Sequence, residues 1–287
     1  MTITSFLVHR PRDQQTSVIF ASPHSGRNYS RALMDQTLLD MQAIRSSEDA
    51  FVDELFSSAI QHGAPLLLAN APRAFLDLNR ASDDLDPALI TGVRKAPQSA
   101  RVTNGLGVVP RVVANGRHIY HGKISLEEAN RRISEYWQPY HTELQKLILE
   151  NKRIFGESIL IDCHSMPDEA LRSATRKGTP RPDIVLGDRF GGACSKLIVD
   201  KIEAAFTSAG FQVAHNQPFA GAYIAQRYGH PAFHQHVVQI EINRSLYMNE
   251  KQITRLEGFY DFRSRLDRVI AEIVEIGRPR TSKIAAE

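Results

Sequence analysis

Short apolar runs separated by helical stretches are the feature that most constrains the fold of this chain. The runs cover residues 17–21, 65–69, 75–78, 158–162, 183–186 and 236–242. Their brevity and β-branched content favour buried strands over helices. Amphipathic stretches expected to be helices cover residues 49–61, 125–151, 194–208 and 251–276. This alternation predicts an α/β fold whose sheet is covered by helices on both faces.

The organisation along the chain indicates one domain over residues 1–287, because neither a linker nor an internal repeat is apparent. Ser125 and Glu128 match a capping box at the start of the longest predicted helix. Pro139 is expected to kink or split that helix. Two long turn-rich segments, 81–122 and 165–192, are predicted to be either functional or disordered loops.

Composition excludes several classes of protein. Of 287 residues, 42% are hydrophobic and 23% are charged, which rules out a disordered chain, a coiled coil and a collagen-like fibre. The net charge of +3 is too small to predict a nucleic-acid or membrane partner. The most basic loop carries Arg172, Arg176, Lys177 and Arg181, but no aromatic platform for bases accompanies it.

The predicted location is the cytoplasm. The two cysteines cannot form a disulfide framework, the first ten residues do not resemble a signal peptide, and no apolar run reaches the length of a membrane span. The oligomeric state does not follow from the sequence.

Two histidines follow predicted strands in the same local pattern. His24 lies in Ser-Pro-His-Ser-Gly after the strand at 17–21, and His164 lies in Asp-Cys-His-Ser after the strand at 158–162. Since α/β proteins place ligand sites at the carboxyl ends of strands, the pair predicts a shared metal site. The alternative for each is a turn histidine bonded to the backbone.

Acidic residues at a predicted helix start offer a third ligand. Glu48 and Asp49 stand there, where a carboxylate also serves as a cap or a partner of the helix dipole. Two imidazoles and one carboxylate would leave an open position on zinc, the usual catalytic arrangement.

A carboxylate in the middle of an apolar strand indicates a second role. Glu241 shares a strand face with Gln239 and Asn243 and is costly to bury unless something stabilises it. The candidates are a water that must lose a proton, or a structural ion pair with an arginine. Arg80, beside Asn79, offers a bidentate fork for a substrate carboxylate, with a solvated strand end as the alternative.

Seven motifs in order resemble the N-formylglutamate amidohydrolase family. They are SPHSG at 22–26, EDAFVDELF at 48–56, FLDLNR at 75–80, YWQPYH at 136–141, IDCHS at 161–165, FAGAYI at 219–224 and IEINRSLYM at 240–248. The family is similar to zinc carboxypeptidases and aspartoacylases. The resemblance therefore implies a phosphorylase/hydrolase-like α/β fold with one mixed sheet flanked by helices.

The resemblance also implies one zinc ion per chain. Its ligands would be His24, His164 and Asp49, with Glu48 as the fallback for the carboxylate. Carboxypeptidase relatives carry a glutamate three residues after the first histidine, where this chain has Arg27. The carboxylate must therefore come from elsewhere in the chain.

The same resemblance implies the remaining roles. Glu241 would be the catalytic glutamate, Asn79 and Arg80 would hold a substrate carboxylate, and Tyr223 would cover the site. Arg244 departs from some family members, and is expected to contact the substrate or to pair with a neighbouring acid.

The predicted function is zinc-dependent hydrolysis of an N-formyl or other N-acyl amino acid, such as N-formylglutamate, to formate and the free amino acid. One alternative is a metal-binding homologue of the same fold without turnover. Another is a metal-independent serine hydrolase using Ser25 or Ser165, although each serine directly follows its histidine, which is poor geometry for a triad, and no Gly-x-Ser-x-Gly elbow is present.

Overall fold

A seven-stranded mixed sheet forms the centre of the molecule. The computed structural model describes residues 4–94, 98–174 and 181–279. In spatial order the strands are β1 (Phe6–His9), β3 (Leu66–Ala69), β2 (Val18–Ser22), β6 (Ser158–Met166), β9 (Gln235–Asn243), β7 (Ile184–Gly187) and β8 (Val213–His215). The four strands from β3 to β9 are parallel, whereas β1 and β7 run antiparallel to their inner neighbours. The predicted α/β fold with a mixed sheet is confirmed.

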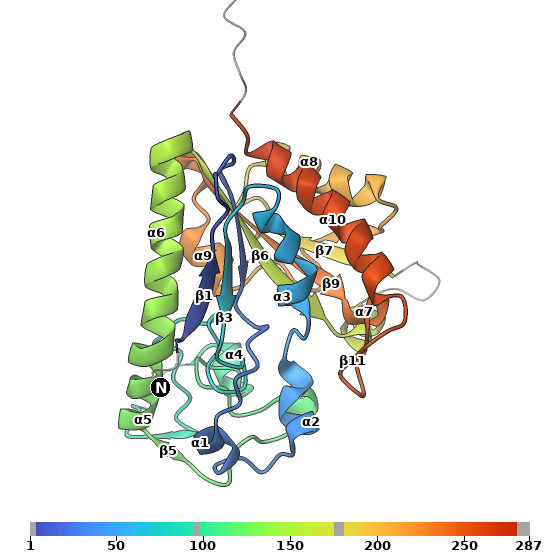
Figure 1. Ribbon diagram of the computed structural model, residues 1–287. Coiled ribbons are helices and arrows are strands. Elements are labelled where there is room, and N and C mark those ends of the chain that lie inside the picture. Colours follow the sequence, from blue (N-terminus) through green and yellow to red (C-terminus); the bar gives the residue numbers. More distant parts are fainter. Residues whose placement is uncertain (1–3, 95–97, 175–180, 280–287) are drawn as a thin grey trace, which may run out of the picture.

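Helices cover both faces of this sheet (Figure 1). One face packs against α3 (Val52–Leu55), α8 (Lys196–Ser208) and α10 (Phe259–Ile276), and the other against α5 (Leu126–Arg132), α6 (Gln138–Phe155) and α9 (Tyr223–Tyr228). Strands β2, β6 and β9 are buried along their whole length, which is why they read as continuous apolar runs.

The two faces of the inner strands differ in polarity near their carboxyl ends. Ile161 and Cys163 of β6 join the core beneath α8 and α10, so the intervening Asp162 and the following His164 point to the opposite face. The site therefore lies on the α6 and α9 side of the sheet.

The predicted long helix is divided at the point where Pro139 stands. Helix α5 ends at Arg132, a π-helical turn covers Ile133–Trp137, and α6 begins at Gln138. Pro139 is the second residue of α6 and has no N–H to donate to the preceding turn, and the π-helical turn, in which Gln138 N–H donates to Ile133 O, lies directly before it. Ser125 accepts a hydrogen bond from the backbone N–H of Glu128 at 3.1 Å, which is one of the two bonds of the predicted capping box, whereas the Glu128 carboxylate accepts from Arg131 and Arg132.

Three predicted elements are wrong in extent or kind. The helix expected over 49–61 is only α3 and a 3₁₀ turn, because Phe51 has a left-handed backbone (φ 67°) that ends any helix before Val52. Residues 75–78 form turns rather than a strand. The Asp77 N–H donates a hydrogen bond to the carbonyl oxygen of Val108, which lies in another loop. The last helix begins at Phe259 instead of Lys251.

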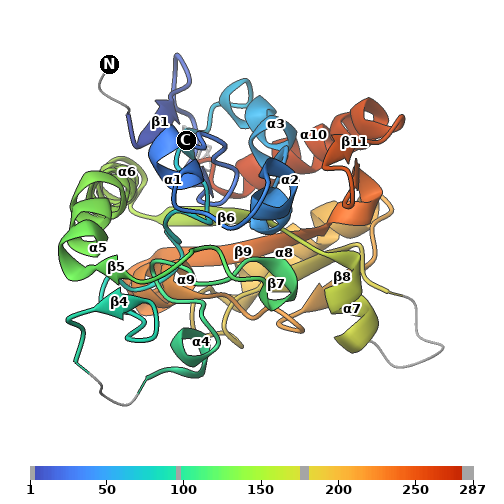
Figure 2. The same cartoon turned by 90° about the horizontal axis from the view of Figure 1, so that it is seen from below.

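The remaining elements are short. They are α1 (Arg31–Met34), α2 (Met41–Ile44), α4 (Ala100–Thr103), α7 (Asp168–Ala174) and the strand pairs β4 (Ile90–Thr91) with β5 (Ile124–Ser125) and β10 (Met248–Asn249) with β11 (Thr254–Arg255). The long segment that carries β4 and α4 lies on the side of the sheet away from α10, near α9 (Figure 2). None of the described helices is both long and apolar enough to cross a membrane.

Candidate metal centre

Strand pairing places the polar residues of β6 and β9 side by side. In the parallel register Asp162 is opposite Gln239, and His164 is opposite Glu241. Residues paired in this way point to the same face of a sheet. The two motifs that the sequence places about 75 residues apart thus meet at one edge, where β2 also ends.

His24 reaches this edge from the turn after β2. Gly26 makes the turn possible, because a Cβ there would lie 2.1 Å from the carbonyl oxygen of Ala71. The carbonyl of His24 accepts a hydrogen bond from Asp49 N–H at 3.0 Å, which fixes the acidic segment beside the turn.

His24, Asp49 and His164 converge. One ligand atom from each lies within 4.8 Å of the other two, and all three residues are buried. Asp49 Oδ2 is 3.0 Å from His164 Nδ1 and 3.6 Å from His24 Nδ1. The structure brings together the three residues predicted as metal ligands.

The donor set fits a divalent cation. His24 Nδ1 is buried and has no hydrogen-bond partner among the described residues. On the other side of the rings, His24 Nε2 is hydrogen-bonded to Asp77 Oδ1 at 2.7 Å, and His164 Nε2 lies 3.0 Å from Asp162 Oδ1 in an ion-pair contact. A carboxylate behind each imidazole is the usual outer shell of a metal-binding histidine.

The electrostatics around these residues favour a cation. Burial alone would raise the pKa of Asp49, but the hydrogen bond to His164, the nearby imidazole of His24 and the charge of Arg244 hold that pKa well below its usual range. Burial would lower the pKa of His164, but Asp162, Asp49 and Glu241 raise it well above its ordinary value. The surrounding carboxylates therefore stabilise positive charge at this point.

Glu48, the fallback ligand, has another role. Its carboxylate accepts hydrogen bonds from Arg45 Nε at 2.9 Å and Nη2 at 3.0 Å, and from the hydroxyl of Tyr29 at 2.9 Å. These partners occupy both oxygens, so Asp49 is the acidic member of the cluster.

Glu241 lies buried beside the cluster. Burial, reinforced by Asp49 and opposed by His164, raises its pKa to about 7. Its Oε1 accepts a hydrogen bond from Gln239 Nε2 at 2.8 Å. Among the described residues no arginine or lysine lies within ion-pair distance of Glu241, which weakens the structural alternative. A carboxyl with a pKa near neutrality can both accept and return a proton.

Arg80 and Asn79 both line the cavity, but they differ in how many of their polar groups are already hydrogen-bonded. Arg80 donates from Nε to Leu106 O and from Nη1 to Asn79 O, each at 2.9 Å, and Nη2 has no hydrogen bond among the described residues. The Asn79 side chain accepts from Ile224 N–H at 2.8 Å and lies 3.2 Å from His164 Nε2. Arg80 thus retains donors for an anion, and Asn79 ties the 219–224 loop to the centre.

Arg244 was predicted to contact the substrate or to pair with an acid, and Tyr223 was predicted to cover the site. Arg244 lines the cavity, but its guanidinium is bonded to Asp49 Oδ1 at 2.8 Å and to Ser165 Oγ at 3.1 Å. Tyr223 packs against Trp137 and lines a neighbouring hollow rather than the cavity around the cluster. Contact of either side chain with a substrate stays a prediction.

Sequence reasoning missed Arg73 as a cavity residue. Its Nε donates to Asp77 Oδ2 at 3.1 Å, and its guanidinium lines the cavity near Asp49 and Glu241. It lies in an irregular loop six residues before Asn79, where a single sequence carries no periodic signal. Asp77 and Asp162, which hold the two histidines, were visible only as polar residues in apolar runs.

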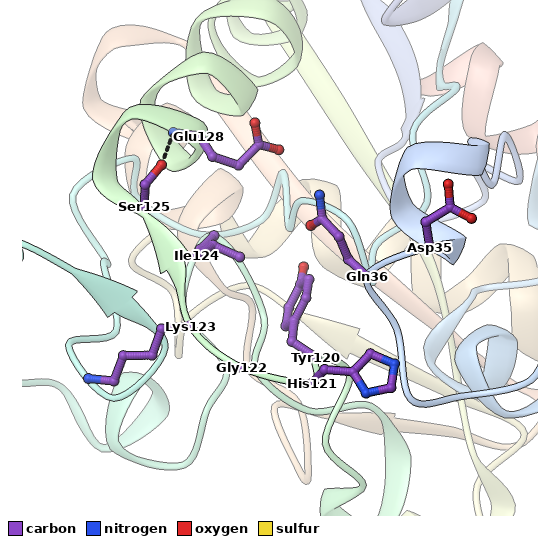
Figure 3. A pocket seen from close by; sticks show the side chains of 9 residues that line it. All are labelled: Asp35, Gln36, Tyr120, His121, Gly122, Lys123, Ile124, Ser125 and Glu128. Carbon is purple, nitrogen blue, oxygen red and sulfur yellow. Dashed lines mark hydrogen bonds between the residues drawn. The ribbon is translucent and has the colours of Figure 1, made fainter.

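The cavity has a volume of about 680 Å³ and opens beside the cluster. A second hollow, of about 400 Å³, lies at the start of α5 and contains none of the predicted site residues (Figure 3). The cavity around the cluster is large enough for a small substrate.

The serine alternative has no geometric support. Ser25 Oγ accepts from Ser22 Oγ at 2.9 Å, and Ser165 Oγ accepts from Arg244. Neither hydroxyl is hydrogen-bonded to an imidazole anywhere in the described part of the chain, so no nucleophile and base pair is formed.

The fold and the buried polar cluster define a hydrolase-type site at the carboxyl edge of an α/β sheet. A family model described as N-formylglutamate amidohydrolase matches residues 16–248. The chain belongs to the N-formylglutamate amidohydrolase family, which confirms the predicted resemblance and the predicted class of enzyme.

Relatives support this membership over nearly the whole chain. An N-formylglutamate deformylase of Pseudomonas aeruginosa is 30% identical over 237 residues, covering 82% of this chain and 83% of the relative. One of Pseudomonas putida is 28% identical over 238 residues, with the same coverage. The crystal structure of N-formylglutamate amidohydrolase from Ralstonia eutropha has a TM-score of 0.89 at 33% identity, covering 96% of this chain and 99% of that one.

Proposed function

We propose that this protein is a zinc-dependent amidohydrolase that cleaves N-formylglutamate, or a closely related N-acyl amino acid, to formate and the free amino acid. The observation that carries the proposal is the convergence of His24, Asp49 and His164 beside the buried carboxyl of Glu241. The names of the curated relatives support the choice of substrate.

His24 Nδ1, His164 Nδ1 and Asp49 Oδ2 would hold one zinc ion. Zinc bound by such a set polarises an amide carbonyl and lowers the pKa of water to about 7. Asp77 and Asp162 orient the two imidazoles, and Arg244 orients Asp49.

Glu241 moves the proton. It takes a proton from the attacking water and delivers it to the amide nitrogen as the C–N bond breaks. The water oxygen ends in the released formate, and the nitrogen leaves as the amine of the free amino acid. Gln239 keeps the carboxyl of Glu241 in place through its 2.8 Å hydrogen bond.

Arg80 fixes the substrate. Its guanidinium is buried, donates to two backbone carbonyls and has Nε 3.9 Å from Asp77 Oδ2, which leaves Nη2 available to a substrate carboxylate. Holding the α-carboxylate there places the scissile amide over the cluster, a positioning effect worth several kcal/mol. One zinc ion per chain and a cytoplasmic location stay predictions.

The test is turnover by the purified chain with and without metal. We expect hydrolysis of N-formylglutamate that is lost after chelation and restored by zinc. Activity that survives complete metal removal would support a metal-independent hydrolase instead. A zinc-loaded protein that releases formate from no N-formyl amino acid would support the non-catalytic homologue.

A further inference from the structure

Four guanidinium groups line the cavity around the metal cluster, and they differ in their partners. Arg73 and Arg244 are each paired with a buried aspartate of the site, at 3.1 and 2.8 Å. Arg80 donates to two backbone carbonyls, lies 3.9 Å from Asp77 Oδ2, and is assigned above to the α-carboxylate. The fourth, Arg101, belongs to the short helix α4.

The guanidinium of Arg101 is free. It is exposed, and within the described residues it has neither an ion pair nor a hydrogen bond to another group. Its helix is fixed nonetheless, because Ser99 caps it by accepting a hydrogen bond from Val102 N–H at 3.3 Å. The side chain is therefore an exposed cation at the cavity wall, with no countercharge among the described residues.

Arg101 also lies close to Arg80. Both residues line the main cavity and the neighbouring hollow of about 610 Å³, so they stand where the two spaces meet. The positive charge of Arg101 contributes to lowering the pKa of the Arg80 guanidinium, after the larger effects of burial and Arg73. Two adjacent cations at one junction are suited to a ligand with two carboxylates.

The charge of the whole cavity leads to the same ligand class. Four arginines line it, against three carboxylates, Asp49, Asp77 and Glu241. A divalent cation at the cluster would add two further positive charges. A substrate carrying two negative charges offsets this excess better than one with a single carboxylate.

We propose that Arg101 binds the side-chain carboxylate of an N-acyl dicarboxylic amino acid while Arg80 holds its α-carboxylate. This assignment rests on the proposed function and names the residue that selects an acidic side chain. Arg101 acts in substrate selection and takes no part in the movement of protons at the amide.

The experiment compares two substrates that differ only in side-chain charge, N-formyl-L-glutamate and N-formyl-L-glutamine. In Arg101→Gln we expect kcat/KM for the glutamate derivative to fall about 10- to 100-fold, the usual range for a hydrogen bond between charged groups. The value for the glutamine derivative should stay within about threefold. Arg101→Lys should lose less than Arg101→Gln, because it keeps the charge but not the fork.

Arg227→Gln is the matched control. Arg227 is also exposed and lines the neighbouring hollow, but it does not line the cavity around the cluster. It should leave both kcat/KM values near those of the wild type. If Arg227→Gln produced the same selective loss, general surface charge rather than Arg101 would explain the preference.

A binding measurement tests the role of Arg101 independently of the proposed enzymatic activity. Calorimetric titration of the zinc-loaded chain with L-glutamate and L-glutamine needs no turnover, and Arg101→Gln should weaken only glutamate binding, about 10-fold or more. Equal effects on both ligands, or none, would overturn the role of Arg101. If the wild type hydrolyses neither N-formyl substrate, the proposed function fails, and the titration alone decides the role of Arg101.

Discussion

At the scale of single residues, the adjacent carboxylates of Glu48 and Asp49 have different partners. Glu48 is bonded to Arg45 and Tyr29, whereas Asp49 faces both imidazoles. The sequence could place both acids near His24 but could not separate them, because each stands at the start of an expected helix. Phe51 has a left-handed backbone conformation, which shapes this segment. The hydrophobic periodicity of the sequence does not predict that conformation.

Asp49→Asn should weaken zinc binding by more than about 100-fold, since even an outer-shell change costs 10- to 100-fold in metal affinity. Glu48→Gln, which makes the same change of charge one residue earlier, should leave zinc affinity within a few fold of the wild type. Competition with a chromophoric chelator measures both values. A larger loss in Glu48→Gln than in Asp49→Asn would reverse the assignment.

Glu241→Gln should keep zinc and lose at least about 100-fold in kcat, because an amide of the same shape cannot accept the proton of water. Metal analysis and steady-state kinetics on the same preparation check both parts. Near-normal turnover in this variant would remove Glu241 from the reaction.

At the scale of elements, the parallel register of β6 and β9 builds the site, and the sequence predicted both strands. It also predicted that Gln239, Glu241 and Asn243 share a face. It missed the edge strands β1 and β8, which are only four and three residues long and only partly buried or exposed. Short edge strands carry little apolar pattern, so periodicity does not mark them.

The π-helical turn and the start of α6 support the loop that carries Asn79. Trp137 Nε1 donates to Arg80 O and His141 Nε2 donates to Leu78 O, each at 2.9 Å, so the two bonds lie on either side of Asn79. The sequence showed Trp137 and His141 as parts of the YWQPYH motif at 136–141, without indicating which groups they contact. The fold therefore uses a helix interruption to hold the substrate-binding segment.

His141 should make the stability of the fold depend on pH. Burial lowers its pKa to about 4, against about 6.5 in an unfolded chain. Between these values the unfolded state binds more protons, so the free energy of unfolding falls as the pH is lowered from about 6.5 to 4. The full loss is about 3 kcal/mol.

Urea unfolding of the wild type and His141→Gln at pH 7 and pH 4.5 measures this contribution. The variant should lose less of its stability on acidification than the wild type does. His118→Gln, a change at an exposed histidine, should behave as the wild type. An unchanged pH slope in His141→Gln would show that His141 is not the group responsible.

At the scale of the whole molecule, two cores on opposite faces of one sheet hold three distant segments at its carboxyl edge. The layered α/β architecture followed from the apolar runs, and the mixed sheet followed from the family resemblance. The cavity wall did not, because Arg73 and Arg101 lie in the irregular segments between β3 and α5, whose course depends on tertiary contacts.

The central claim is that His24, Asp49 and His164 bind one metal ion. Equilibrium dialysis of the chain against zinc, followed by metal analysis, tests it most directly. We expect one zinc ion per chain in the wild type, and less than about a tenth of that in His24→Ala/His164→Ala at the same free zinc concentration. A wild type that retains no zinc, or a double variant that retains as much as the wild type, would contradict the account.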